Sequence, residues 1–172
     1  MSTGAQTRPV TLPPREDWPQ PPARTKGGEL LTELIATIFR LNGVLMDVAQ
    51  ELAAAGGVTA AWWQVLGGVV DEPRSVADIA RRMGMTRQGV QRVADLLVER
   101  GLAEYRPNPA HRRAKLLSLT DAGSWAIQQI ALVQRPWADQ IARELGANKL
   151  HEALLTTRQL IAVLETTTQH AE

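Results

Sequence analysis

The chain has no cysteine and no long apolar run. Without thiol groups, disulfides, thiolate nucleophiles, cysteine-based redox sensing and zinc sites built on sulfur are excluded. A bilayer-spanning helix needs roughly 18 or more consecutive apolar residues, and no segment offers them. The first ten residues, MSTGAQTRPV, lack the apolar stretch of a signal peptide. We therefore expect a cytoplasmic protein with no membrane partner.

Catalytic motifs are also missing. The three histidines, His111, His151 and His170, are scattered along the chain, and no metal-ligand spacing is present. No glycine-rich loop is placed to cradle a phosphate, and no nucleophile lies in a recognisable motif. The sequence therefore argues against an enzyme, and it predicts neither a cofactor nor a metal site.

Acidic residues are scarce in one segment. Between Arg81 and Lys115 there are nine Lys and Arg residues against three acids, a balance of +6, and the rest of the chain carries 10 − 15 = −5, in agreement with the net charge of +1. A basic segment in an otherwise acidic protein is typical of a binding surface for a polyanion such as nucleic acid. Taken without any helix pattern, the same charges fit an ordinary solvated face equally well.

The length of 172 residues and the hydrophobic content of 44% allow a buried core in one domain or in two closely joined subdomains. Residues 1–26 hold six of the ten prolines and few large apolar residues apart from Trp18. This composition predicts a mostly disordered N-terminal arm.

Two outer segments carry long apolar stripes at helical spacing. In residues 27–58 a helix is expected from Glu29 to the glycines at 56 and 57. In residues 121–168 a helix capped by Thr120 is followed, after GAN at 146–148, by a last helix. Pro136 is expected to kink or interrupt the first of these two helices because it cannot donate a backbone hydrogen bond.

The central segment, residues 59–120, reads as three short helices and a hairpin. Thr59 is placed to cap the first, AAWWQVLGGVV, with Trp63, Leu66 and Val70 on one side. Ser75 caps the second, with Asp78 in a position resembling a capping box, and Gly84 ends it. Thr86 caps the third, which ends at Gly101. Two helices joined by a tight turn that contains glycine indicate a helix-turn-helix.

The third helix has two faces of different composition. Its apolar stripe consists of Val90, Val93, Ala94 and Leu97. The opposite face has no acid in its first two turns, and arginine suits guanine O6 and N7 whereas glutamine suits adenine N6 and N7. A winged helix used for protein contacts would instead show apolar or acidic side chains there. Which residues read bases and which hold phosphates stays open, and Thr86 is primarily a cap.

The third helix, the second of the helix-turn-helix, is the one expected to enter the DNA groove, and we call it the recognition helix. After it, the predicted strands LAEYR and AKLLSL enclose the loop PNPAHRR. This hairpin directly after the recognition helix predicts a wing. The DNA-binding residues predicted on the helix and the wing are Thr86, Arg87, Gln88, Gln91, Arg92, His111, Arg112 and Arg113.

The apolar stripes of the outer segments are too long for the small central block to cover. Interlocking of these N- and C-terminal dimerisation helices from two chains would produce a two-fold homodimer. Such a dimer would read a pseudo-palindrome in duplex DNA, with half-sites roughly 34–36 Å apart. A bundle formed within one chain is the alternative.

The central segment resembles the multiple-antibiotic-resistance-regulator (MarR) family. The resemblance rests on W-Q-V-L at 63–66, the run SVADIARRMGMTRQGVQR, R-G-L, the N-P-x-x-R-R wing and L-T-x-x-G at 119–123. It implies a mainly α fold, in which dimerisation helices flank a winged helix-turn-helix core with a small β-hairpin wing. It also implies a homodimeric transcription factor, often a repressor, released from DNA by a small aromatic or phenolic ligand. A constitutive or architectural DNA-binding protein without an effector is the alternative.

Two further expectations concern this resemblance. The family ligand binds between the dimerisation helices and the winged helix, where Phe39, Met46, Trp62 and Trp63 are candidates, although core packing explains each one too. Because Trp62 and Trp63 are adjacent on a helix, we expect only one of them to pack in the core. In the wing, His111 stands where the family commonly has an aspartate that braces the wing arginine, so the brace for Arg113 must come from elsewhere.

Overall fold

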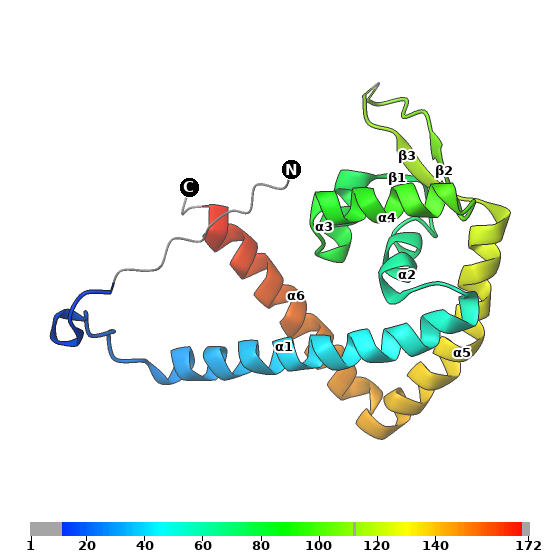
Figure 1. Ribbon diagram of the computed structural model, residues 1–172. Helices are drawn as coiled ribbons and strands as arrows, with labels where there is room; N and C mark the ends of the chain where they lie inside the picture. The colour runs from blue at the N-terminus through cyan, green and yellow to red at the C-terminus, as the bar shows by residue number, and fades with distance from the viewer. Residues whose placement is uncertain (1–11, 112, 170–172) are drawn as a thin grey trace. The chain divides into compact units, whose positions relative to one another are not determined.

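The computed structural model describes residues 12–111 and 113–169, and it is mainly helical with a small antiparallel sheet (Figure 1). The helices are α1 (Lys26–Ala53), α2 (Ala60–Gly67), α3 (Val76–Met83), α4 (Arg87–Glu99), α5 (Asp121–Leu145) and α6 (Ala147–Gln169), and the strands are β1 (Arg74–Ser75), β2 (Ala103–Arg106) and β3 (Leu116–Leu119). The predicted mainly α winged helix-turn-helix fold is confirmed. Among the described residues, none of the helices has the length and apolar character needed to cross a membrane.

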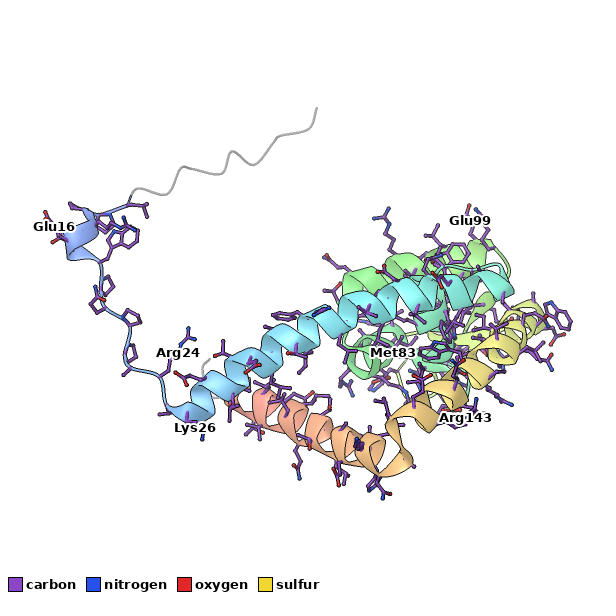
Figure 2. All side chains as sticks on the ribbon, turned by 90° about the horizontal axis from the view of Figure 1, so that it is seen from below. Glu16, Arg24, Lys26, Met83, Glu99 and Arg143 are labelled. Carbon is purple, nitrogen blue, oxygen red and sulfur yellow. The ribbon has the colours of Figure 1, made fainter. Side chains whose placement is uncertain are left out.

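The chain divides into two compact units, residues 1–42 and 43–172, with the division inside α1. In the described part of the first unit, a short 3₁₀ helix, Arg15–Asp17, carries Glu16, and Arg24 lies just before the start of α1 (Figure 2). The indole Nε1 of Trp18 donates to the carbonyl oxygen of Pro13 at 3.0 Å. The prediction of a disordered arm stays a prediction, since residues 1–11 lie outside the described part.

The first residue of α1 is Lys26, earlier than the Glu29 expected from the apolar stripe. The hydroxyl of Thr25 accepts a hydrogen bond from the backbone N–H of Gly28 at 3.1 Å, which satisfies one of the free donors of the first turn. The helix therefore begins where a cap is available, one turn before its apolar stripe begins.

Hydroxyl caps begin the four helices α2 to α5, as the sequence predicts. In each case the side-chain oxygen accepts the backbone N–H three residues further on, at 3.1–3.2 Å, and the capping residues are Thr59, Ser75, Thr86 and Thr120. These hydrogen bonds satisfy donors that have no partner within the helix. Four helix starts are thus determined by local chemistry alone.

One hydrophobic core joins α2, α3, α4, the sheet and α5. Leu66, Ile79, Leu97, Leu117 and Ile130, one from each of these elements, have at most 1% of their surface exposed. Figure 2 shows the side chains crowded around this region. The core therefore holds the helix-turn-helix rigidly against the sheet and α5.

The extent of α2 was predicted wrongly. The helix ends at Gly67, and Val70, expected on its apolar side, is 47% exposed. A Cβ added at Gly68 would lie 3.0 Å from Cγ2 of Ile79. The absence of a side chain at Gly68 thus lets α3 approach the end of α2 closely.

The sheet has the order β1-β3-β2, with both pairings antiparallel. The hairpin β2–β3 is the predicted one, with Ala103 opposite Leu119 and Arg106 opposite Leu116. The two-residue strand β1 was missed, because so short a strand has no alternating pattern, and it exists only through pairing with β3. The β2–β3 hairpin projects away from α2, α3 and α4 (Figure 1).

The L-T-x-x-G motif has a structural explanation. The Thr120 hydroxyl donates to the carbonyl oxygen of Gly101 at 2.7 Å, and its backbone N–H donates to the carbonyl oxygen of Leu102 at 3.2 Å. A Cβ at position 123 would collide with that same carbonyl oxygen of Leu102. Gly123 therefore lets the start of α5 rest directly on the turn that follows α4.

The helix α5 runs through Pro136 without interruption, and the kink expected as the other outcome stays a prediction. The ring removes the donor that would pair with the carbonyl of Leu132, and both residues are exposed, so water can satisfy that carbonyl. The helix therefore lacks one backbone hydrogen bond, at a position that is exposed to solvent.

Apolar side chains remain uncovered on the outer helices. On α1 and α6 the exposed ones include Leu31, Leu34, Leu41, Leu45, Leu154, Leu155, Ile161 and Leu164.

Candidate nucleic-acid interface

The apolar face of helix α4 is buried and its polar face is exposed, as the sequence predicts. Val90, Ala94 and Leu97 are fully buried, and Val93 is partly buried. Arg87, Gln88, Gln91 and Arg92 are all exposed. One face of the helix therefore packs in the core and leaves four polar side chains toward solvent.

A two-residue turn fixes α4 relative to α3. Gly84 has a φ of 62°, in the left-handed region that glycine tolerates, and the backbone N–H of Met85 donates to the carbonyl oxygen of Ala80 at 2.9 Å. This closes α3 with the helix-ending arrangement common at such glycines. Thr86 then caps α4 at once, so the polar face of α4 is presented at a defined angle.

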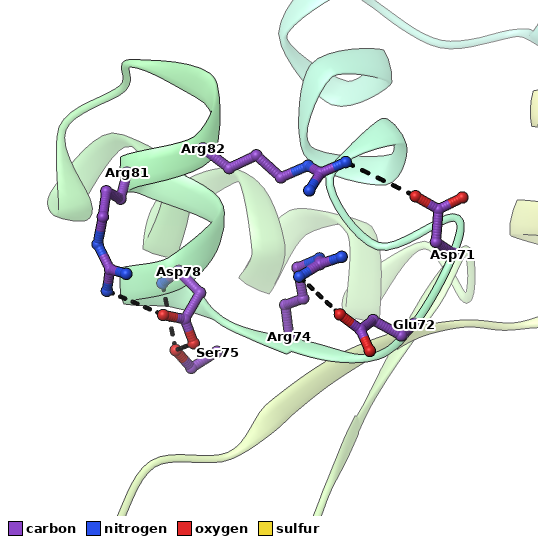
Figure 3. A network of polar contacts seen from close by, with 7 residues as sticks. All are labelled: Asp71, Glu72, Arg74, Ser75, Asp78, Arg81 and Arg82. Atoms are coloured by element: carbon purple, nitrogen blue, oxygen red, sulfur yellow. Dashed lines mark hydrogen bonds and ion pairs between the residues drawn. The ribbon is translucent and has the colours of Figure 1, made fainter. Parts of the chain in front are cut away.

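Acids neutralise part of the basic segment. Arg81 and Arg82 on α3 form ion pairs with Asp78 at 2.9 Å and with Asp71 at 3.6 Å (Figure 3). The Ser75 hydroxyl donates to Asp78 Oδ2 at 2.6 Å, and this hydrogen bond, with the charge of Arg81, lowers the pKa of Asp78 below its ordinary value. These cations, which the sequence analysis counted toward the binding surface, are thus partly compensated.

A further ion pair of this kind lies in the hairpin, where Arg106 Nη2 is 2.6 Å from Glu104 Oε1. By contrast, Arg87, Arg92 and Arg113 form no ion pair with any residue that the structure describes. Within residues 81–115, the positive charge that no described acid compensates therefore lies on α4 and the wing.

The helix and the wing enclose a shared hollow of about 320 Å³, between the start of α3, α4 and the hairpin. Its lining residues include Ser75, Arg87, Gln91, Tyr105, Arg113 and Lys115. The structure thus brings together three of the predicted residues, two from α4 and one from the wing, that are far apart in the sequence.

One feature of this surface was missed by the sequence analysis. Gln91 Nε2 donates to Asp95 Oδ1 at 2.9 Å and to the Tyr105 hydroxyl at 2.8 Å, and that hydroxyl donates to the same Asp95 oxygen at 2.7 Å. Burial, followed by the hydrogen bond to Asp95, raises the pKa of Tyr105 from 10.0 to about 12. The spacing of Gln91 and Asp95 puts them on one helix face, but only the fold brings the strand residue Tyr105 to them.

Asn108 organises the turn of the wing. Its Oδ1 accepts the backbone N–H of Ala110 at 2.9 Å, and its carbonyl oxygen accepts the backbone N–H of His111 at 3.3 Å. Arg113 is exposed and has no carboxylate partner among the described residues. Arg112, also predicted to contact DNA, lies outside the described residues.

The tryptophans differ from expectation. Trp62 and Trp63 are both partly buried, and both pack against the core, so the expectation that only one does is wrong. Helix α2 has only eight residues and contacts α3, α4 and α5. The guanidinium carbon of Arg100 lies 5.8 Å from the centre of the Trp62 ring. Trp125 on α5 is 62% exposed.

The other two candidate ligand residues lie on α1. Phe39, in the first unit, is 74% exposed. Met46, in the second unit, is partly buried, and its Sδ accepts a hydrogen bond from Gln64 Nε2 at 3.6 Å.

A separate hollow of about 750 Å³ runs along α5 and includes Trp125, Leu132 and Arg135. Among the described residues, no group of three or more His, Asp or Glu side chains is placed to hold a metal ion.

Comparison with known proteins agrees with this geometry. Residues 56–114 match a family model described as MarR family. A Mycobacterium tuberculosis protein of uncharacterized function is 48% identical over 100 residues, which are 58% of this chain and 70% of the relative.

Two solved structures share the fold. A mutant Escherichia coli MarR in complex with operator DNA has a TM-score of 0.66 and 21% identity, and the match covers 80% of this chain and 99% of that one. The Staphylococcus aureus MarR in complex with salicylate and kanamycin has a TM-score of 0.65 and 17% identity, with 82% and 96% covered. Taken with the winged helix-turn-helix described above, these matches show that the chain belongs to the MarR family of transcription regulators.

Proposed function

We propose that this protein binds operator DNA as a homodimer, with α4 in the major groove and the wing at the adjacent minor groove. The exposed face of α4 carries the proposal, because its first two turns present two arginines and two glutamines and no acid. The mutant Escherichia coli MarR of the same fold was solved on operator DNA, which supports a role in binding duplex DNA. The cytoplasmic location is part of the same proposal.

The interface residues divide into two groups. Four side chains on α4 face base edges and phosphates, namely Arg87, Gln88, Gln91 and Arg92. The Thr86 hydroxyl caps α4 next to the sugar-phosphate backbone of the DNA. On the wing, Arg113 enters the minor groove, whose negative potential is strongest where A·T-rich sequence narrows it. His111 and Arg112 are the other wing residues proposed to contact DNA.

The outer helices form the dimer. Residues 27–58 and 121–168 carry the exposed apolar side chains of α1 and α6, including Leu34, Leu41 and Leu154. Large contiguous apolar surfaces on a soluble protein mark interaction sites, and a second copy covers them symmetrically. Two recognition helices are then held at one fixed separation.

The proposed regulation is repression relieved by a small aromatic ligand. The Staphylococcus aureus MarR of the same fold was solved with salicylate, which supports a ligand of this class. We place the ligand near Phe39, Met46, Trp62 and Trp63, as the resemblance implies. The alternative is a constitutive or architectural regulator without an effector.

The decisive experiment measures binding to the DNA upstream of the protein's own gene, by fluorescence anisotropy at two salt concentrations. Arg87→Ala combined with Gln91→Ala should abolish sequence-specific binding and leave the dimer intact by light scattering. Arg143→Ala is the control, since it removes a cation near the far end of α5 (Figure 2). Unchanged affinity in the double variant would contradict the assignment of α4.

A panel of phenolic carboxylates added to the wild-type complex then tests the regulation. Release of the DNA by one compound supports a ligand-responsive repressor. Tight binding that no compound weakens supports the constitutive alternative.

A further inference from the structure

The hollow of about 320 Å³ between the start of α3, α4 and the hairpin is lined by positive charge. Three cationic side chains line it: Arg87 from α4, and Arg113 and Lys115 from the hairpin. All three are exposed, and none of them forms an ion pair with a residue that the structure describes. The hollow therefore offers an anion three charges without an ion-pair partner in the described part of the chain.

Two carboxylates are hydrogen-bonded to residues of this lining, and neither belongs to the lining itself. Asp95 Oδ1 accepts from the Tyr105 hydroxyl at 2.7 Å. Asp78 Oδ2 accepts from the Ser75 hydroxyl at 2.6 Å, and its Oδ1 lies 2.9 Å from Arg81 Nη2. Each acid thus reaches the hollow only through a neutral hydroxyl, and every charged group among the described lining residues is a cation.

The place of the hollow identifies the anion that it fits. In duplex DNA, a sugar-phosphate backbone separates the major groove from the adjacent minor groove. A helix in the major groove and a wing at the adjacent minor groove therefore lie on either side of one backbone strand. The hollow lies between α4 and the hairpin, so this strand passes over it.

Helical spacing divides the polar side chains of α4 into two rows. Arg87 and Gln91 are four residues apart on one side of the helix, and both line the hollow. Gln88 and Arg92 are also four residues apart, about 100° further around the helix axis, and neither lines the hollow. The first row therefore faces the backbone strand, and the second row is directed away from it.

We infer that the hollow is a seat for one phosphodiester of the DNA backbone in each half-site, held by Arg87 and Lys115. Guanidinium and ammonium groups both make charge-assisted hydrogen bonds to phosphate oxygens. The second row, Gln88 and Arg92, then reads the bases, and Arg113 reaches the minor groove from the wing side of the seat. This inference rests on the proposed function, in which α4 enters the major groove, and it adds Lys115 to the residues that contact DNA.

The surroundings of Tyr105 support the position of Lys115. Tyr105 lines the hollow and packs against the core, and Lys115 Nζ lies 5.8 Å from its ring centre, within the range of a cation–π contact. Burial, followed by the hydrogen bond to Asp95, raises the pKa of the Tyr105 hydroxyl to about 12. The hydroxyl is therefore uncharged at neutral pH and does not repel a phosphate.

The test replaces single phosphates of the operator by uncharged methylphosphonates and measures affinity by fluorescence anisotropy. Wild type should show one position in each half-site where the replacement weakens binding by about tenfold or more. In the variant that combines Arg87→Ala with Lys115→Ala, the same replacement should weaken binding by no more than about twofold, because the charged partners of that phosphate are gone.

Two control variants separate this seat from other contacts. Arg106→Ala removes a cation of the same hairpin that is already 2.6 Å from Glu104, and it should keep the full methylphosphonate effect. Arg87→Ala and Arg92→Ala each remove one exposed arginine of α4. In selection from randomised duplexes, Arg87→Ala should keep the base preference of wild type, whereas Arg92→Ala should change it.

Inorganic phosphate has the same chemistry as the backbone group, so it is also added to the complex and compared with chloride at equal ionic strength. Stronger displacement by phosphate, without any methylphosphonate-sensitive position, would assign the hollow to a free anion and overturn the inference. A methylphosphonate effect that persists in the double variant would overturn it too, while specific binding by wild type would leave the proposed function intact. If wild type selects no sequence at all, the proposed function fails, and the inference fails with it.

Discussion

The salt dependence of DNA binding tests whether the wing arginine, proposed to enter the minor groove, neutralises the phosphates that flank it. Arg113 is exposed and has no carboxylate partner among the described residues. Each phosphate contact contributes about −0.9 to the slope of log K against log salt. A dimer carries two copies, so Arg113→Ala should make the slope less steep by about 1.8. Between roughly 50 and 200 mM salt, the variant would then lose about 12-fold less affinity than wild type.

Arg106→Ala is the matched control, because it removes one positive charge from the same hairpin. Its guanidinium is already 2.6 Å from Glu104, so it has few counterions to release on binding. Anisotropy titrations at four or more salt concentrations give the slopes, and we expect the control to change the slope by less than about 0.5. Equal slopes in wild type and Arg113→Ala, or an equal change in both variants, would refute a specific contact from Arg113.

Three further predictions concern stability and ionisation. Leu97→Ala should lower the free energy of unfolding by about 2–5 kcal/mol in denaturant titrations at fixed protein concentration, whereas Leu96→Ala, at a 37% exposed position on the same helix, should change it by less than about 0.5 kcal/mol. Gly123→Ala should cost about 1–3 kcal/mol because its Cβ meets a backbone carbonyl, whereas Gly43→Ala, with open space around it, should be neutral or stabilising. Tyr105 is the one tyrosine of the chain, so phenolate absorbance after rapid pH jumps should give a pKa near 12 in the folded protein and near 10 when unfolded. Because the folded pKa is raised, the stability contributed by its neutral form should be complete below pH 10 and lost as the pH rises toward 12; a folded-state midpoint at 10 would contradict the network.

The local features of this fold were readable from the sequence. Capping by Thr59, Ser75, Thr86 and Thr120 depends only on a hydroxyl and the backbone three residues away. The turn at Gly84 depends on a backbone conformation that glycine adopts without strain. The division of α4 into an apolar and a polar face follows from helical periodicity. These features determined the winged helix-turn-helix and the predicted recognition helix.

Only the tertiary structure decided which groups of that helix are available. Arg81 and Arg82 belong to the basic segment by sequence, yet nearby acids partly compensate them. Gln91 is a glutamine on a polar face by sequence, yet a tyrosine 14 residues away holds one of its donors. Periodicity assigns a side chain to a face, but its hydrogen-bond partners come from segments that meet only after folding, and those partners decide which atoms remain free for DNA.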